Sequence, residues 1–381
     1  MIINILCAES LGARGLSCSI QLKRRNILID PGIALGWSRH GLLPHPFQVA
    51  VGAGVRQTII DELHQATDIV FSHYHGDHCP LHDANPYQLG LDQARDSLSR
   101  CRILARGPGN ASPAQQRRRL ELTRAAQTNW QDAEGSVQGP LEFSVPVPHG
   151  QKGDERGMVM MTKIAEDGTV FVHASDIQLL DRTAIEIISG WKPDIVLASG
   201  PALYHYSSPS GDVLRERAWE NALELSQNTG TLIIDHHLLR SGEGVAWLDK
   251  LNHASENPVM CAADFMKREP LFLEAWRKEL YEWMPVPGSW HDRYRRGTVD
   301  TGPYRARGWK ELASRGMIRP CTWYACCPIR YYTDAGKLDP CWTERYCLVN
   351  NRQCVRYRME ENGQYHPDNM LPNGEIKENL S

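Results

Sequence analysis

The 381-residue sequence lacks the features that mark several classes of protein. No apolar run approaches the roughly 18 residues that span a bilayer, so we expect no membrane segment. The net charge of −3 provides no global field that would draw the chain to nucleic acid or an anionic membrane. Residues 1–7 lack a basic region and a cleavage site, which predicts a first strand in place of a signal peptide. A cytoplasmic protein without membrane contact is therefore expected.

The chain also lacks internal repeats, low-complexity tracts and the paired Cys-x2-Cys spacing of zinc ribbons. It does have eleven cysteines, of which five are scattered and six fall between Cys321 and Cys354. Because no export signal is evident, a reducing compartment is expected, and thiols or metal ligation are favoured over disulfides. The length is enough for a large core and about two domains.

The run 71–80, FSHYHGDHCP, places four candidate metal ligands within six positions. It follows the apolar segment 68–71, which predicts a buried strand that ends at the site. The candidates are His73, His75, Asp77 and His78. The first two histidines can share one metal, because alternate side chains leaving a strand point to one side. A turn at Gly76 would direct the other two ligands to a second metal. Clustered His and Asp are costly to bury unpaired, so metal binding is favoured over packing.

This His-x-His-x-Asp-His pattern is the signature of the metallo-β-lactamase superfamily, which the chain resembles. The resemblance implies an α/β fold, a four-layer αβ/βα sandwich with two metals at one edge. It also implies later ligands at strand ends, in the order histidine, aspartate, histidine. The strands that we expect at 141–148, 169–174 and 230–234 end beside such residues. These residues are His149, Asp176 and His236.

By this resemblance, the ligands divide into two sets that share a bridging carboxylate. One metal would be bound by His73, His75 and His149, the other by Asp77, His78 and His236, with Asp176 between them. His237 is the alternative last ligand. We favour His236 because it directly follows the strand and because Arg240, four places on, resembles the spacing in related ribonucleases.

Two further residues are expected to support the metal site without binding metal. The first is His237. The second is Asp30, at the end of a strand expected at 26–30, where the superfamily has a supporting aspartate. A turn-forming aspartate before Pro-Gly is an equally good explanation of Asp30.

A narrower resemblance is to an archaeal family of uncharacterised predicted metallo-hydrolases. It is carried by the runs Glu9–Gly12, Leu28–Gly32 and Gly41–Pro46, and it extends from residue 1 to about residue 290. Because the function of that family is not established, the resemblance informs fold and ligands more than substrate.

The pattern predicts a dinuclear metal-dependent hydrolase that uses a metal-bridging hydroxide on an ester, phosphodiester or related bond. Zinc suits these ligands best, and iron or manganese remain alternatives. Asp77 would orient the water or take its proton. His45, Tyr204 and His205 lie in loops and are candidates to face the substrate. The substrate, a small molecule or a nucleic acid, and the oligomeric state stay open.

Two other functions are compatible with the sequence. A nuclease of the same fold is favoured by the arginines at 117–119 and 293–296 and disfavoured by the near-neutral net charge. An iron-containing redox protein linked to a C-terminal iron–sulfur cluster is favoured by the cysteines. However, di-iron members of the superfamily typically replace a motif histidine by a carboxylate and need a flavin domain, and neither feature is evident here.

Composition predicts three segments. Residues 1–257 form the metallo-β-lactamase-like domain, 258–315 a helical extension and linker, and 316–381 a small Cys-rich module. Four thiolates in the module are expected to hold a 4Fe–4S cluster or a structural zinc, unless they are free buried cysteines. The candidates are Cys327, Cys347 and Cys354, with Cys321 or Cys341 as the fourth. Nearby aromatics and the proline after Cys327 favour the cluster.

Overall fold

The computed structural model describes residues 1–127, 129–151, 153, 157–206 and 209–380. The chain divides into two compact units, 1–262 with 272–300 and 263–271 with 301–381. These units differ from the three segments expected from composition, since 272–300 belongs with the first unit and 301–315 with the second. Within the described ranges, no helix is both long and apolar enough to cross a membrane.

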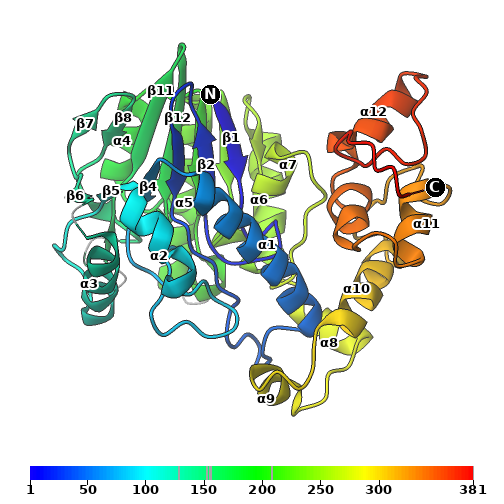
Figure 1. Ribbon diagram of the computed structural model, residues 1–381. Coiled ribbons are helices and arrows are strands. Elements are labelled where there is room, and N and C mark those ends of the chain that lie inside the picture. The colour runs from blue at the N-terminus through cyan, green and yellow to red at the C-terminus, as the bar shows by residue number, and fades with distance from the viewer. Residues whose placement is uncertain (128, 152, 154–156, 207–208, 381) are drawn as a thin grey trace. The chain divides into compact units, whose positions relative to one another are not determined.

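The first sheet of the first unit has six strands in the order β1-β2-β3-β4-β5-β6 (Figure 1). The strands are Ile2–Ile5, Cys18–Gln21, Asn26–Ile29, Asp68–Phe71, Arg102–Ala105 and Trp130–Asp132. β1 to β3 pair antiparallel, whereas β3 to β6 run parallel. β3 and β4, both rich in buried aliphatic residues, therefore end at the same edge of the sheet.

The second sheet has the order β15-β14-β13-β12-β11-β8-β7, and β12 to β15 are parallel. In chain order its strands are Val137–Gln138, Leu141–Phe143, Thr162–Glu166, Thr169–Ser175, Ile195–Ala198, Thr231–Ile234 and Val259–Met260. A separate two-stranded sheet pairs β9 (Val147–Pro148) with β10 (Met158–Val159). The single strand expected at 141–148 is thus two short strands, β8 and β9, in different sheets.

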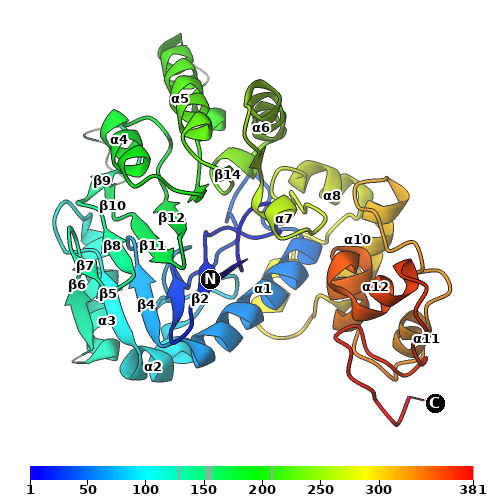
Figure 2. The same ribbon diagram turned by 90° about the horizontal axis from the view of Figure 1, so that it is seen from above.

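Helices cover the outer face of each sheet, as Figure 2 shows. On one side lie α1 (Pro46–Gln65), α2 (Leu91–Arg100) and α3 (Pro113–Ala126). On the other lie α4 (Arg182–Gly190), α5 (Pro209–Gln227) and α6 (Gly242–Ala254). This arrangement of helix, sheet, sheet and helix is the four-layer αβ/βα sandwich that the sequence predicted. Shorter helices of this unit include α8 (Arg277–Trp283) and α9 (Trp290–Arg295), while α7 (Ala262–Phe265) falls at the boundary.

Helix α1 begins directly after His45, one of the candidate substrate residues. Its first residue is Pro46, and the Nδ1 atom of His45 accepts a hydrogen bond of 3.1 Å from the Phe47 amide. Proline in the first turn and a side-chain cap both favour a helix start here. Gly52 and Gly54 lower the helix propensity of this stretch, so the sequence alone indicates the first half of α1 only weakly.

The second unit consists of short helices and turns. They are α10 (Gly302–Ser314), α11 (Pro328–Asp334), a π-helical turn (Thr343–Leu348), a 3-10 turn (Asn351–Gln353) and α12 (Val355–Glu361). One apolar cluster of this unit gathers Ile329, Leu338, Leu371 and Leu380, with Cys327, Tyr332 and Trp342 packed against it.

Candidate metal centre

The carboxyl ends of parallel strands from both sheets form the site. Asp30 follows β3, His73 lies two residues after β4, Asp176 follows β12, and His236 lies two residues after β14. Parallel strands of one sheet point the same way, so loops distant in sequence meet at these ends, where α/β proteins commonly bind ligands.

The first ligand set is His73, His75, His149 and Asp176, whose ligand atoms lie within 4.8 Å of one another. The Oδ2 atom of Asp176 is 3.1 Å from Nε2 of His149 and 3.5 Å from Nε2 of His73. It is also 3.9 Å from Nδ1 of His75. One oxygen of a single carboxylate therefore faces three imidazoles.

The second ligand set is Asp77, His78 and His236. The other oxygen of Asp176, Oδ1, lies 3.2 Å from Nε2 of His78 and 3.6 Å from Nε2 of His236. The same His236 nitrogen is 3.4 Å from Oδ2 of Asp77. Asp176 thus presents one oxygen to each set, which is the geometry of a bridging carboxylate.

Both candidates for the last histidine are at the site, but on different sides of Asp176. Nε2 of His237 lies 3.2 Å from Oδ2, the oxygen that faces the first set. His236 alone joins the group of Asp77 and His78. The geometry therefore pairs His236 with the second ligand set.

Hydrogen bonds to the Nδ1 atoms orient the rings of His73 and His78. Oδ2 of Asp30 lies 3.2 Å from Nδ1 of His78, and Oδ1 accepts a bond of 2.8 Å from the Ser72 amide. The Ser72 hydroxyl donates to Asp30 and contacts Nδ1 of His73 at 2.9 Å. Since its one proton is donated to Asp30, this hydroxyl accepts from Nδ1–H of His73, and Nε2 of His73 keeps its lone pair. Such contacts fix ring orientation at metal sites.

Other supporting residues were not found from the sequence. The side-chain amide of Gln178 lies 3.2 Å from Nδ1 of His149, and the Tyr206 hydroxyl donates to Gln178 Oε1 at 2.7 Å. The Gly15 amide donates to Nδ1 of His236 at 3.2 Å. No motif marks these positions. The one available signal for Gln178 is its place two residues after a predicted ligand.

The donor set fits divalent cations. Nε2 of His73 and Oδ1 of Asp176 are buried and have no hydrogen-bond partner among the described residues. Burial, His78 and His75 lower the pKa of His73 to about 3, so its imidazole is neutral at pH 7. Although burial raises it, neighbouring histidines hold the pKa of the Asp176 carboxyl well below its usual range. Neutral imidazole and ionised carboxylate are the forms that bind metal.

A buried arginine links the site to the start of the chain. Nε of Arg240 donates to Glu9 at 2.9 Å, and its Nη2 lies 2.8 Å from Nε2 of His236 and 3.5 Å from Oδ2 of Asp77. The Ser10 amide donates to the Asp235 carboxylate at 3.1 Å. Glu9 and Ser10, two residues that carry the archaeal resemblance, therefore hold the segment that bears the last histidine.

The three candidate substrate residues differ in position. His45 is fully buried, and its ring caps α1 and contacts the Met284 carbonyl at 2.9 Å. Its position is therefore that of a structural residue, and it does not face the substrate as the sequence had suggested. Tyr204 is half-buried, with its hydroxyl 3.3 Å from Nη1 of Arg240. His205 is exposed, and its ring packs against that of Tyr204 at 4.4 Å between ring centres with the planes tilted by 52°. His75 and Asp77 keep 24% and 18% side-chain exposure, which marks the open edge of the site.

Of the arginines that favoured a nuclease, those at 117–119 are engaged in contacts within the first unit. Arg117 pairs with Asp83 at 3.2 Å and Arg119 with Asp132 at 2.6 Å. Arg118 donates to the Tyr74 carbonyl at 3.0 Å. This run therefore does not present three free cations to a phosphate backbone.

In the second unit, four of the five candidate cysteines line one pocket. They are Cys321, Cys327, Cys347 and Cys354. Cys341 is exposed and is not among the lining residues, so of the two alternatives for the fourth ligand the structure brings Cys321 to the pocket.

The two sheets, their order and the position of the motif at the carboxyl edge are those of the metallo-β-lactamase fold that the sequence predicted. Solved structures with a similar fold include an isothiocyanate hydrolase from Delia radicum gut bacteria, at 15% identity and TM-score 0.39, covering 68% of this chain and 95% of that one. Another is a metal-dependent hydrolase of the beta-lactamase superfamily, at 14% identity and TM-score 0.40, covering 68% and 94%. At these scores the fold assignment rests on the chain's own topology.

The chain belongs to the UPF0282 family. It is 48% identical over 307 residues to a UPF0282 protein of Methanosarcina mazei, a match that covers 80% of this chain and 99% of the relative. It is 33% identical over 288 residues to one of Pyrococcus furiosus, covering 73% and 91%. No family model matches the chain. The predicted relationship to an uncharacterised archaeal family is confirmed.

Proposed function

We propose that the protein is a dinuclear metal-dependent hydrolase that acts on an ester, phosphodiester or related bond. The observation that carries the proposal is the position of Asp176, whose two oxygens face two separate ligand sets. The first set would hold one ion and the second set the other. Divalent ions held there would supply a hydroxide nucleophile at neutral pH, because metal binding lowers the pKa of water toward about 7.

Asp77 would orient the attacking water or take its proton. Although burial raises the pKa of its carboxyl, His78, His236 and Arg240 hold the pKa far below its ordinary value. The carboxylate is therefore ionised at pH 7 and can only accept hydrogen bonds. Its partial exposure at the open edge lets it reach an incoming substrate.

Arg240 and Tyr204 form the polar wall beside Asp77. A guanidinium only donates hydrogen bonds, so the Tyr204 oxygen accepts from Arg240 and its hydroxyl hydrogen remains available. That hydrogen can be donated to an oxygen of the substrate as negative charge develops there. The guanidinium of Arg39 lies over the Tyr204 ring at 4.7 Å and helps to hold it in place.

The proposal is tested by the double substitution His73→Ala with His149→Ala. Metal content per chain and turnover of a chromogenic ester and a chromogenic phosphodiester are measured. We expect the loss of about one metal equivalent and of turnover, because supporting residues alone are worth about 10–100-fold and ligands more. His82→Ala, an exposed histidine near the motif, is the control and should change neither quantity. Unchanged metal content in the double variant would refute the ligand assignment.

A nuclease remains the second candidate, since a phosphodiester is among the proposed bonds. The engaged arginines at 117–119 make it the weaker one. Assays on single-stranded RNA and DNA beside the small chromogenic substrates separate the two. A preference for the polymers, weakened by salt, would favour the nuclease.

A further inference from the structure

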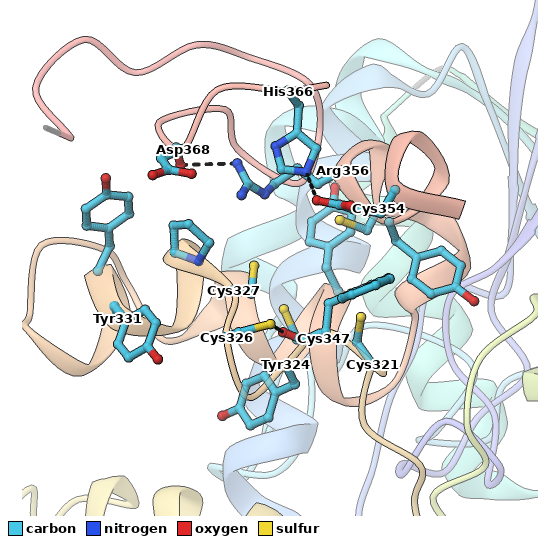
Figure 3. A pocket seen from close by; sticks show the side chains of 16 residues that line it. Cys321, Tyr324, Cys326, Cys327, Tyr331, Cys347, Cys354, Arg356, His366 and Asp368 are labelled. Carbon is cyan, nitrogen blue, oxygen red and sulfur yellow. Dashed lines mark hydrogen bonds and ion pairs between the residues drawn. The ribbon is translucent and has the colours of Figure 1, made fainter. Parts of the chain in front are cut away.

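A pocket of about 550 Å³ in the second unit is lined by the side chains of five cysteines, four of which are the candidate ligands Cys321, Cys327, Cys347 and Cys354 (Figure 3). Cys321 lies in a loop, Cys327 directly precedes α11, Cys347 lies in the π-helical turn, and Cys354 directly precedes α12. The Cys321 amide donates to the Cys347 carbonyl at 2.7 Å, which joins two of these segments. Four separate pieces of backbone thus bring one thiol each to the same space.

The cysteines of the pocket are close enough to influence one another electrostatically. Burial raises the pKa of the Cys347 thiol, and its three neighbours in the pocket raise it further. Burial likewise raises the pKa of Cys321 to about 11, with contributions from Cys354 and Cys327. Four buried or half-buried thiols that line one pocket form a candidate ligand set, because the cysteine side chain binds metal ions as a thiolate.

Backbone amides around two of the thiols donate toward the sulfur atoms. Burial raises the pKa of Cys354, and the amides of Tyr357 and Arg356 oppose this shift by donating toward its sulfur. The Trp323 amide does the same at Cys321. Amide hydrogen bonds to the ligand sulfurs are one of the means by which proteins tune iron–sulfur clusters.

Arg356 supplies an independent sign of an anionic group. The residue is only 3% exposed and lines the pocket, and its Nη1 donates to three backbone carbonyls. Its Nε atom is buried and has no partner among the described residues. A buried cation with an unpaired donor beside four thiols fits a site whose bound group carries net negative charge.

We propose that Cys321, Cys327, Cys347 and Cys354 bind a 4Fe–4S cluster. No three of these thiols belong to the groups of described ligand atoms that lie within 4.8 Å of one another, which favours the wider spacing of a cluster over a single zinc ion. In a cluster each thiolate binds a different iron, so the sulfurs stand farther apart. This site is independent of the proposed hydrolase centre.

The two remaining cysteines of this region lie outside the ligand set. Cys326 is exposed at the pocket and directs its sulfur to the Trp323 carbonyl at 3.5 Å. Cys341 is exposed and does not line the pocket. Cys341→Ser is therefore a matched control for substitutions of the four proposed ligands.

The test uses the full-length chain purified without oxygen and reconstituted with ferrous iron, ferric iron and sulfide, or with zinc alone. Iron, zinc and acid-labile sulfide are measured per chain, together with the visible spectrum. We expect about four sulfides per chain and broad visible absorption. Acid-labile sulfide distinguishes the cluster from metals at the histidine site. Zinc uptake by the four thiols without labile sulfide would overturn the proposal.

Variants then assign the ligands. Cys321→Ser and Cys347→Ser should lose most of the labile sulfide, whereas Cys341→Ser should keep it. Because Cys321 is only partly buried, its replacement disturbs packing little, and far-ultraviolet circular dichroism checks that the fold is retained. Equal loss in Cys341→Ser, or full sulfide content in both ligand variants, would contradict the assignment.

Discussion

At the scale of single residues, the hydrogen-bond partners of a buried carboxylate indicate whether its oxygens are available to bind metal. Asp176 and Asp30 are both fully buried carboxylates at strand ends. Asp176 presents an unpartnered oxygen to the imidazoles, whereas both oxygens of Asp30 are occupied by Ser72 and His78. The first is therefore suited to bind metal and the second to orient a ligand.

Asp77→Asn should retain the fold and lose most hydrolytic activity. An amide cannot accept the proton of the attacking water, and general base catalysis is worth about 10²–10⁴-fold. Turnover of the chromogenic ester and phosphodiester and a thermal melt provide the measurements. Asp61→Asn, at an exposed position on α1, should behave as the unmodified protein. Near-normal turnover in Asp77→Asn would remove this residue from the mechanism.

At the scale of elements, the ends of the strands carry unusual backbone. Asp30, Ser175 and His236 have positive φ values of 47°, 57° and 61°. Residues other than glycine rarely adopt positive φ values, and backbone strain of this kind is concentrated at functional sites. The turns at these three strand ends direct Asp30, Asp176 and His236 toward the same point.

Gly32→Ala should impair metal binding more than it impairs folding. A Cβ at position 32 would come within 2.3 Å of the His78 carbonyl carbon and the Cys79 amide nitrogen, so the loop of the motif must move. We expect reduced metal content and activity with a modest change in melting temperature. Gly54→Ala, in α1 with open space around its Cβ, should instead stabilise by up to about 1 kcal/mol. Full metal content in Gly32→Ala would show that the loop tolerates the shift.

At the scale of the whole molecule, the candidate metal centre concentrates buried histidines and carboxylates that bound cations would stabilise further. Asp77, Asp176 and Asp30 lie among His73, His78 and His236 at the junction of two sheets. Both sheets contribute, so metal binding ties them together at this edge.

Removal of metal by a chelator should lower the melting temperature of the protein. Ligand binding to the folded state stabilises by about 2.7 kcal/mol when free metal exceeds its Kd by 100-fold. Differential scanning calorimetry with and without the chelator measures the effect. The variant with His73→Ala and His149→Ala should respond less, because it has already lost one ion. An identical melting temperature for both forms of the unmodified protein would contradict a structural contribution of the metals.

Local sequence was sufficient for the motif but not for every role. The motif places four candidate ligands within six positions, so their spacing alone indicates a common site; they are His73, His75, Asp77 and His78. His45 shows the limit, because its loop position suggested a substrate contact, whereas α1 begins there and uses it as a cap. Gln178 and Gly15 were missed because their importance depends on which ring they meet across the fold.

The sequence by itself predicted the fold class, the order of the candidate ligands and the presence of a thiol-rich module, since these follow from the motif, from residue types at strand ends and from composition. Only the tertiary structure decided which oxygen of Asp176 serves which histidines, that His236 joins Asp77 and His78, and that Cys321 and not Cys341 reaches the pocket. The reason is physical. These choices depend on distances between segments far apart in the chain, which are set by the packing of two sheets and, in the second unit, of short helices.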